Sequence, residues 1–488
     1  MSDTCRRASW SGQLAFVLAA AASAIGLGNL WRFPYLAAQY GGGTFILVYL
    51  CLAVTLGFTL MLSEIAIGRM TRQSPLTAYA KLRRRWGFLG LLGTVVPLLI
   101  TPYYCVIGGW VLKYFVTYCQ MAVSGSSPMG AGAAESGAFF QSFVGAPFAP
   151  FGYGITFIVA AAVVIALGVK NGIERSNVFL MPLLFLIAIA ISVYVACLPG
   201  TGEGLRYYLV PSSAALKATG PDGVVAFSFA QLAKTVLGAM GQMFYSLSLA
   251  MGIMITYGSY MRKGDSIECS VRRIEIFDTV VAVIAGLMIV PVVYMFAEKT
   301  GTPVGEAMNQ GPRLMFVTLP KVFATLGAAG AWVGLSFFAL VIFAALTSAI
   351  SLYEACVASL GDLLHIGRGA STFFTGAVVC FLSTFSALGY GPWRDVRIRF
   401  GEHAMQFLDF FDFLSNSVIM PVVAALTCVF IGWVIKPQAV IDEVEAEGRP
   451  FRAKRLYVFM VRYFAPILVT AILVSEVIRT LFPKLWAI

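Results

Sequence analysis

The stretch Ala24-Ile25-Gly26-Leu27-Gly28-Asn29-Leu30-Trp31-Arg32-Phe33-Pro34 interrupts an apolar run that begins near Leu14. A helix that crosses a bilayer needs about 20 apolar residues in a row. Glycine costs roughly 1 kcal/mol in a helix interior, and Asn29 and Arg32 would be unfavourable against lipid. We therefore expect a broken helix whose unpaired carbonyls and amides line a cavity and can bind ions and an anionic head group. The alternative is a close helix contact mediated by the glycines.

A second break is expected in the segment Tyr245–Gly252, which places two serines and a glycine within a later apolar run. The two broken runs are the first and the sixth of the chain. Discontinuous helices at matching positions of two five-helix halves predict an inverted repeat with a binding site near the bilayer midplane. We assign the halves to residues 12–198 and 225–435 and one extra helix to 455–482, within a single membrane domain 1–488.

The composition is that of a membrane protein. Of the 488 residues, 59% are hydrophobic and 12% are charged, and the mean hydropathy is +0.84. Soluble globular domains contain about 25% charged residues. We expect an all-α polytopic protein in the lipid bilayer, with eleven spans. They lie near residues 12–37, 44–67, 88–120, 152–168, 177–198, 225–260, 277–297, 332–361, 370–388, 404–435 and 455–482.

The basic residues indicate the orientation in the membrane. Lys and Arg gather before the first span and in the loops after the second, sixth and tenth spans, and the positive-inside rule places these segments in the cytoplasm. The N-terminus is then cytoplasmic and the C-terminus lies outside. This topology explains the net charge of +11, so no nucleic-acid partner is expected. Nine cysteines and two histidines suggest neither a disulfide framework nor a metal cluster. The charged loop 437–454 is predicted to be a solvated connector.

Around these breaks the sequence resembles the bacterial neurotransmitter:sodium symporters of the LeuT fold, over nearly the whole chain. The motifs that carry the resemblance are Gly26–Pro34, Gly41–Gly43, Glu64 with Gly68-Arg69, Tyr103-Tyr104, Phe244–Gly252 with Ser259-Tyr260, Ala344–Ser348 and Leu408–Asp412. The resemblance implies a LeuT-type 5+5 inverted repeat with discontinuous first and sixth helices and an eleventh, C-terminal helix. It also implies an amino-acid transporter of the bacterial inner membrane, with no enzyme activity, that is a monomer or a weak dimer.

The resemblance implies two sodium sites. The first would use the carbonyl of Ala24 with the side chains of Asn29, Ser246 and Asp278. The second would use the carbonyls of Ala22, Ile25 and Ala344 with the hydroxyls of Thr347 and Ser348. Sodium is a hard cation that prefers oxygen ligands, and broken helices supply carbonyl oxygens. Taken alone, Thr347-Ser348 would be interpreted as bonding to the preceding helical turn.

Asp278 departs from the family pattern, because many relatives carry Asn at this position and some bind chloride nearby. Ala282 likewise stands where chloride-dependent relatives have Ser, whereas Tyr49, Gln242 and Ser246 keep the rest of the chloride pattern. Since a fixed carboxylate already supplies the negative charge, we expect that chloride is not required. We also expect Asp278 to take up a proton when sodium leaves and to carry it outward on the return step. The alternative is a permanently ionised ligand.

The substrate site implied by the resemblance lies between the two breaks. The amides of Leu27 and Gly28 and the Tyr104 hydroxyl would bind a carboxylate. The carbonyls of Tyr245, Ser246 and Ser248 would bind the ammonium. Ala24 belongs to the same set, and the side-chain pocket would be formed by Ser23, Ile100, Ile107, Tyr245, Ser248, Met251, Ser348 and Leu352. None of these is charged, so a neutral, hydrophobic L-amino acid is favoured, because a charged side chain would be left unpaired.

The resemblance implies two gates. The family pattern pairs Arg32 with Asp412 as an outer gate, with Tyr245 as a lid beneath it. A cytoplasmic gate would be formed by Arg7, Trp10, Tyr260 and Asp362. The alternative for Arg7 and Asp362 is that they only set the topology.

Five further positions stand out in the sequence. Gly172 and Pro182 flank the inner end of the fifth span, which we expect to unwind and admit water to the second sodium site. Glu64 is expected to cap backbone groups at a break. Ala250 stands where many relatives have Gly and is expected to stiffen the second break. The intramembrane Glu354 has no role that the sequence assigns.

Other functional classes receive less support. An enzyme needs a catalytic cluster, and a channel needs repeated rings of ligands along a pore, and the sequence indicates neither. Within the transporter class, the alternative substrate is a non-protein amino acid or a betaine-like zwitterion. An amino-acid sensor derived from a transporter is the alternative from another class.

Overall fold

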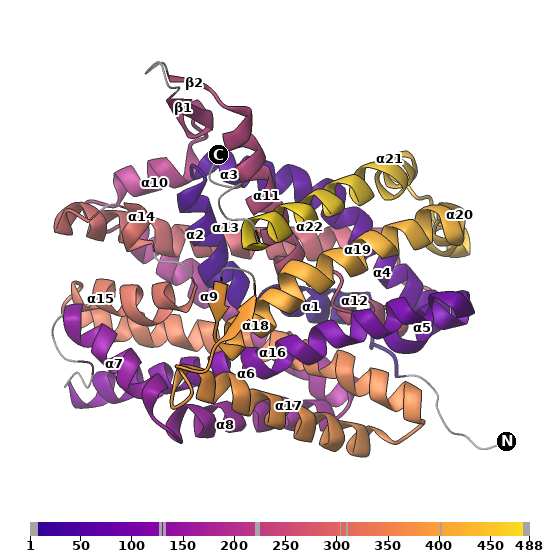
Figure 1. The fold of residues 1–488 in the computed structure, drawn as a ribbon, viewed down its shortest axis with the longest axis horizontal. Helices are drawn as coiled ribbons and strands as arrows, with labels where there is room; N and C mark the ends of the chain where they lie inside the picture. Colours follow the sequence, from indigo (N-terminus) through magenta and orange to yellow (C-terminus); the bar gives the residue numbers. More distant parts are fainter. Residues whose placement is uncertain are drawn as a thin grey trace.

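The protein is a bundle of long helices, seen here in a computed structural model that describes residues 8–125, 129, 133–219, 225–302, 304–308, 311–400 and 403–481. Most helices run along the long axis of the molecule (Figure 1). Short helices cover the two ends of the bundle. Figure 1 shows α7 (Ala133–Gly145), α14 (Val304–Ala307) and α15 (Leu319–Ala324) at the left-hand end, and α5 (Pro75–Leu82) and α20 (Pro437–Val444) at the right-hand end.

The first expected span is broken, as the glycines predict. Helix α1 (Gln13–Ala24) ends where Ile25 adopts an extended conformation, with φ −76° and ψ 93°. The chain continues as the π-helical segment η1 (Gly28–Arg32) and helix α2 (Phe33–Gln39). The two halves meet at 54°. The bend leaves backbone groups of residues 22–27 without regular helical partners in the middle of the bundle.

In the described residues, nine helices are long and apolar enough to cross a membrane, and the bent pair of the first span makes ten. The nine comprise α3, η2 and α4 (Gly43–Leu52, Ala53–Gly57, Phe58–Thr71); η3 and α6 (Arg84–Trp86, Gly87–Ser124); α8 (Ala149–Ala166); η4 and α9 (Val169–Glu174, Arg175–Ala196); α13 (Ile267–Thr300); α16 (Ala328–Leu364); α17 (Arg368–Tyr390); α18, η7, α19 and η8 (Phe407–Asp412, Phe413–Ile419, Met420–Val429, Phe430–Val434); and α21, η10 and α22 (Lys454–Phe459, Met460–Phe464, Ala465–Leu481).

The sixth expected span is divided into two helices, α11 (Phe229–Ser246) and α12 (Ile253–Ser259). The linking turn is left-handed at three positions, Ser248 (φ 52°), Ala250 (φ 58°) and Gly252 (φ 70°). This pair is not among the ten spans counted by length and composition, so the number eleven stays a prediction. The discontinuity itself lies where the serines and glycine of Tyr245–Gly252 predict it.

Small elements connect the spans on the described parts of the chain. Two antiparallel hairpins occur, β1 (Lys217–Thr219) with β2 (Val225–Phe227) and β3 (Ile398–Phe400) with β4 (His403–Met405). Lys217 pairs with Phe227, and Ile398 pairs with Met405. The remaining short helices are α10 (Gly202–Leu209), η5 (Ser213–Leu216), η6 (Leu314–Thr318) and η9 (Ala446–Gly448).

The prediction of a solvated connector at 437–454 is wrong. Helix α20 in this loop buries Val440, Ile441 and Val444. The carboxylate of Glu443 accepts a hydrogen bond of 2.6 Å from Nε of Arg69, whose Nη1 also donates to the carbonyl of Asp265 at 2.7 Å. An apolar stripe at helical spacing, hidden among charged residues, therefore holds this loop on the bundle.

Close helix contacts hold the second break in place. Helix α12 packs against α4, and a Cβ atom at Gly68 would lie 2.0 Å from the carbonyl oxygen of Ile255. Only glycine permits this approach of the two backbones. Helix α6 packs along α16, and both helices contribute residues that lie next to the two breaks.

Candidate functional site

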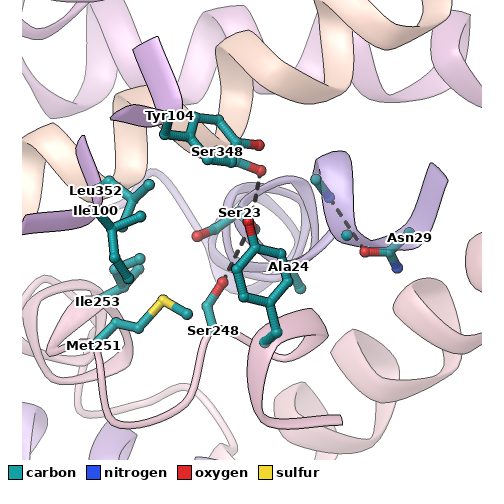
Figure 2. Close-up of a pocket in the computed structure, with 13 residues that line it drawn as sticks. Ser23, Ala24, Asn29, Ile100, Tyr104, Ser248, Met251, Ile253, Ser348 and Leu352 are labelled. Carbon is teal, nitrogen blue, oxygen red and sulfur yellow. Dashed lines mark hydrogen bonds between the residues drawn. The ribbon is translucent and has the colours of Figure 1, made fainter. Parts of the chain in front are cut away.

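A small pocket lies between the two broken helices. Its lining residues come from the first break, α6, the second break and α16, and are Ser23, Ala24, Gly26, Gly28, Asn29, Ile100, Tyr104, Tyr245, Ser248, Met251, Ile253, Ser348 and Leu352. Figure 2 shows Ile100, Met251, Ile253 and Leu352 gathered on one side and Asn29 on the opposite side. We call this the central pocket. Its volume of about 20 Å³ is room for roughly one water molecule.

Ten of the thirteen residues expected at the substrate site line this pocket. The exceptions are Leu27, Ser246 and Ile107. The Leu27 amide nevertheless donates to the Tyr104 hydroxyl at 3.2 Å. Ile107 lines a second cavity, to which α7 also contributes Phe140 and Gln141. The sequence interpretation missed Ile253 and Gly26, although Ile253 directly follows the Gly252 that ends the second break.

Three side chains expected at the first sodium site, those of Asn29, Ser246 and Asp278, meet at the Asp278 carboxylate on α13. Asn29 Nδ2 donates to Oδ1 at 2.8 Å, and the Ser246 hydroxyl lies 2.9 Å from both carboxylate oxygens. The Tyr49 hydroxyl donates to Oδ2 at 3.0 Å. Asp278 is fully buried. The Asn29 amide oxygen faces the Gly26 amide at 3.4 Å, so it must turn to become a ligand of an ion beside Asp278.

The residues expected at the second sodium site lie where α16 crosses the first break. The Ser348 hydroxyl donates to the carbonyls of Ser23 at 3.0 Å and Ile25 at 3.3 Å. The Thr347 hydroxyl bonds to its own helix, at Phe343 (3.0 Å) and Ala344 (3.1 Å), which is the bond that the residue pair alone would suggest. One hydroxyl therefore bridges to the break and the other stays within α16.

The side chains and carbonyls at these two places offer oxygen ligands to a cation. Within the described ranges, no three His, Cys, Asp or Glu side chains gather into a possible metal site. One carboxylate, a carboxamide, hydroxyls and backbone carbonyls form a donor set that suits a hard monovalent cation better than a transition metal. The residues present therefore fit sodium.

Glu64 on α4 fixes the second break. Its Oε1 accepts a hydrogen bond of 2.6 Å from the amide of Ala250, and its side chain is buried. Ala250 has a positive φ, so its amide points away from the helical direction and needs a partner outside the helix. The expectation that Glu64 caps freed backbone is confirmed.

A larger cavity of about 670 Å³ lies beside the central pocket and shares Tyr245 with it. We call it the gate cavity, lined among others by Trp31, Arg32, Tyr103, Ile107, Tyr245 and Asp412. The Arg32 guanidinium lies 5.6 Å from the centre of the Tyr245 ring. Asp412 Oδ1 accepts from the Tyr103 hydroxyl at 2.9 Å and from Asn416 Nδ2 at 2.6 Å.

Arg32 and Asp412 share this cavity but do not pair directly. Both belong to the described part of the chain, and no nitrogen of Arg32 lies within 4.0 Å of a carboxylate oxygen of Asp412. The Asp412 carboxylate is held by Tyr103 and Asn416 while Arg32 lies over Tyr245, and the pairing of the two charges as a gate across the substrate stays a prediction.

The opposite end of the site is closed by packing. Trp10 is fully buried, donates from Nε1 to the Tyr257 carbonyl at 3.1 Å and accepts on its own carbonyl from Arg262. Tyr260 donates to Glu354 at 2.7 Å. Asp362 accepts from the Ser74 amide at 2.6 Å, at the start of α5. Arg7, the fourth residue expected at this gate, lies outside the described residues.

The fifth span begins with an irregular segment. Gly172 lies in the π-helical segment η4, where an added Cβ would be 1.9 Å from the Val164 carbonyl oxygen, and Pro182 lies inside α9. The Ser11 backbone amide and hydroxyl both donate to Glu174 at the end of η4. The segment between Gly172 and Pro182 is therefore tied to the start of α1, and its unwinding stays a prediction.

Two discontinuous helices that face each other across oxygen-rich breaks are the architecture of a secondary transporter with coupled ions. Residues 7–126 and 153–485 match the model of the sodium:neurotransmitter symporter family. The chain is 32% identical over 469 residues to the uncharacterized sodium-dependent transporter YhdH of Bacillus subtilis (strain 168), covering 96% of this chain and 97% of that protein. It is 23% identical over 479 residues to the human sodium- and chloride-dependent GABA transporter 2, covering 91% and 75%.

Among solved structures, MhsT in complex with L-phenylalanine matches with a TM-score of 0.82 and 34% sequence identity, covering 96% of this chain and 100% of that chain. The chain therefore belongs to the sodium:neurotransmitter symporter family and is a sodium-dependent symporter of the LeuT fold.

Proposed function

We propose that the protein imports a neutral, hydrophobic L-amino acid together with sodium, by alternating access to the central pocket. The observation that carries the substrate class is the lining of this pocket. The described residues around it include no charged side chain, and four apolar ones lie together on one side (Figure 2). The structural relative MhsT was solved in complex with L-phenylalanine, which is a neutral, hydrophobic L-amino acid.

The two ends of an amino acid would bind to backbone groups at the breaks. The amides of Leu27 and Gly28 and the Tyr104 hydroxyl would hold the carboxylate, and the carbonyls of Tyr245, Ser246 and Ser248 would hold the ammonium. The Leu27 amide already lies beside the Tyr104 hydroxyl. The apolar side chain would lie against Ile100, Met251, Ile253 and Leu352. Since the pocket is small, Met251, whose side chain is flexible, must move to admit it.

Sodium would bind at both groups of oxygens. Asp278, Asn29, Ser246 and the Ala24 carbonyl would hold the first ion, beside the substrate carboxylate. The carbonyls of Ala22, Ile25 and Ala344 with Thr347 and Ser348 would hold the second. The Ser348 contacts to Ser23 and Ile25 support this assignment, because they bring α16 onto the first break. Each ion would stabilise the break in the first helix and so couple sodium to transport.

Chloride is not required in this proposal. The hydroxyls of Tyr49 and Ser246, which keep part of the chloride pattern, both bond to the Asp278 carboxylate, and the buried Ala282 offers no hydroxyl. A second anion there would meet a like charge in a medium of low dielectric constant. We further propose that Asp278 takes up a proton when sodium leaves, which would make proton antiport part of the return step.

Access would alternate between the gate cavity and the end closed by Trp10. Arg32, Tyr245 and Asp412 would close the outer side over bound substrate. Trp10, Tyr260 and Asp362, with Arg7, would open the cytoplasmic side. Unwinding between Gly172 and Pro182 would then release the second sodium ion. We place the N-terminus in the cytoplasm and the C-terminus outside, in a bacterial inner membrane.

The test is binding by the purified protein of each of the twenty L-amino acids in NaCl, sodium gluconate and KCl. We expect a neutral hydrophobic amino acid to bind in both sodium salts and not in KCl. Binding of charged amino acids instead, or equal binding in KCl, would contradict the proposal. Uptake into proteoliposomes against a concentration gradient, driven by sodium, separates a transporter from a sensor. An outward proton flux during that uptake tests the role of Asp278.

A further inference from the structure

A second acid approaches Arg32 from the C-terminal helix. A small side cavity of about 30 Å³ lies between η1, α11, η7 and α22, and its lining includes Arg32, Gly241, Asn416 and Glu476. Helix α22 packs against α11, η7 and α19, so this face of the helix is turned toward the bundle. Glu476 and Arg32 therefore line the same space, which has room for about one or two water molecules.

The geometry of the outer gate leaves Arg32 available to that acid. Asp412 has its own hydrogen bonds from Tyr103 and Asn416, and Arg32 makes no direct ion pair with it in the described structure. The amide oxygen of Asn416 is buried and has no hydrogen-bond partner among the described residues. Asn416 lines both the gate cavity and the side cavity. An amide oxygen without a hydrogen-bond donor and a carboxylate thus belong to residues that line the same side cavity as Arg32.

We propose that Glu476 is a positioning residue of the outer gate. It holds Arg32 toward α22, through water in the side cavity, while the gate cavity is open. When substrate binds, Arg32 leaves Glu476 and closes toward Asp412. The proposal rests on the outer gate of the proposed function and gives the C-terminal helix a part in it.

Competition between two acids for one cation sets the direction of the expected effect. Removing the charge of Glu476 leaves Asp412 as the remaining partner of Arg32, so the closed gate gains population. Glu476→Gln keeps the size of the side chain. Glu476→Asp keeps the charge and should restore the balance. Ser475→Ala is the matched control on the same helix, because the Ser475 hydroxyl bonds to the Ile472 carbonyl of its own turn.

The measurement is the rate at which a membrane-impermeant thiol reagent labels Ile107→Cys in the gate cavity, in sodium and in potassium, with the unmodified chain as background. We expect Glu476→Gln to slow labelling roughly fivefold, with near wild-type rates for Glu476→Asp and Ser475→Ala. In an Arg32→Gln background, Glu476→Gln should have no further effect. Unchanged labelling in Glu476→Gln, or the same slowing with and without Arg32, would overturn the proposal.

A second readout separates this inference from the proposed function. The association rate of L-phenylalanine should fall in Glu476→Gln by a similar factor, because substrate enters through the open gate. Labelling of Ile107→Cys needs no substrate. A wild-type protein that binds no neutral amino acid would thus refute the proposed function, while the labelling rates would still decide the role of Glu476.

Discussion

Glu354 and Arg368 form an ion pair in which Oε2 of the acid lies 2.6 Å from Nη2 of the base. The Glu354 side chain is 0% exposed and that of Arg368 is 29% exposed. Tyr260 donates to the other carboxylate oxygen at 2.7 Å, and Arg368 Nε donates to the carbonyl of Ile165 at 2.7 Å. The pair therefore joins α16 and α17 to the end of α8 and to Tyr260 after α12, at the end expected to face the cytoplasm.

Removing only the base of this pair should be costly. Arg368→Gln leaves the Glu354 charge buried without its cation, which destabilises a protein by about 3–5 kcal/mol. The double variant Glu354→Gln/Arg368→Gln removes both charges, so its free energy of unfolding should fall clearly less than that of Arg368→Gln. Thermal unfolding of the purified protein in detergent measures both. A double variant at least as unstable as Arg368→Gln alone would contradict this account of the pair.

The sequence predicted the fold correctly at the two breaks, where residues that are unusual in an apolar helix mark the interruption. Gly26 to Pro34 indicated the first break, and Tyr245 to Gly252 indicated the second, because glycine, serine and charge are expensive in an apolar helix. Glu354 received no role, since its partner Arg368 lies fourteen residues away beyond a turn and no local pattern links the two. Helix α20 was misassigned because its charged residues outweighed three buried apolar ones. The Arg32 geometry depends on the conformational state of the gate, which a sequence does not specify.

The second break is strained at Ala250, whose φ of 58° is left-handed. The left-handed conformation costs a non-glycine residue about 1–2 kcal/mol. Glycine removes this strain, but it also makes the unfolded chain more flexible, which offsets part of the gain in stability. We expect Ala250→Gly to stabilise the protein by up to about 1 kcal/mol. Gly252→Ala is the matched opposite, because φ is 70° and its Cβ would lie 2.5 Å from Cγ of Pro75. The melting temperature should rise in Ala250→Gly and fall in Gly252→Ala. A fall in both variants would show that backbone strain at Ala250 does not lower the stability of the protein.

The contact between Arg69 and the loop of α20 should require arginine. Arg69 is 3% exposed and donates to the Glu443 side chain and backbone and to the carbonyls of Lys263 and Asp265. Lysine has no planar fork to serve these acceptors together, so Arg69→Lys should cost about 2–3 kcal/mol. Lys454→Gln is the control, because its pair with Glu445 is exposed and should contribute less than about 1 kcal/mol. Protease cleavage within 437–454 should also become faster in Arg69→Lys alone.

The charge of Asp278 should decide whether the protein responds to chloride. Asp278→Asn keeps the shape of the side chain but removes the negative charge to which Tyr49 and Ser246 bond. Chloride could then take its place, so we expect binding of L-phenylalanine by the variant to be roughly tenfold tighter in NaCl than in sodium gluconate, a difference of about 1.4 kcal/mol. The wild type should bind equally in both salts.

The control for this experiment is Glu275→Gln, which removes a buried acid one turn earlier on α13. Neither Tyr49 nor Ser246 donates a hydrogen bond to Glu275 in the described structure, so this variant should remain indifferent to chloride. If Glu275→Gln also became chloride-responsive, loss of charge anywhere on α13 would suffice, and the specific contact with Tyr49 and Ser246 would not be the cause. Chloride-dependent binding by the wild type would refute the proposal outright, because the fixed carboxylate of Asp278 would then not replace the anion.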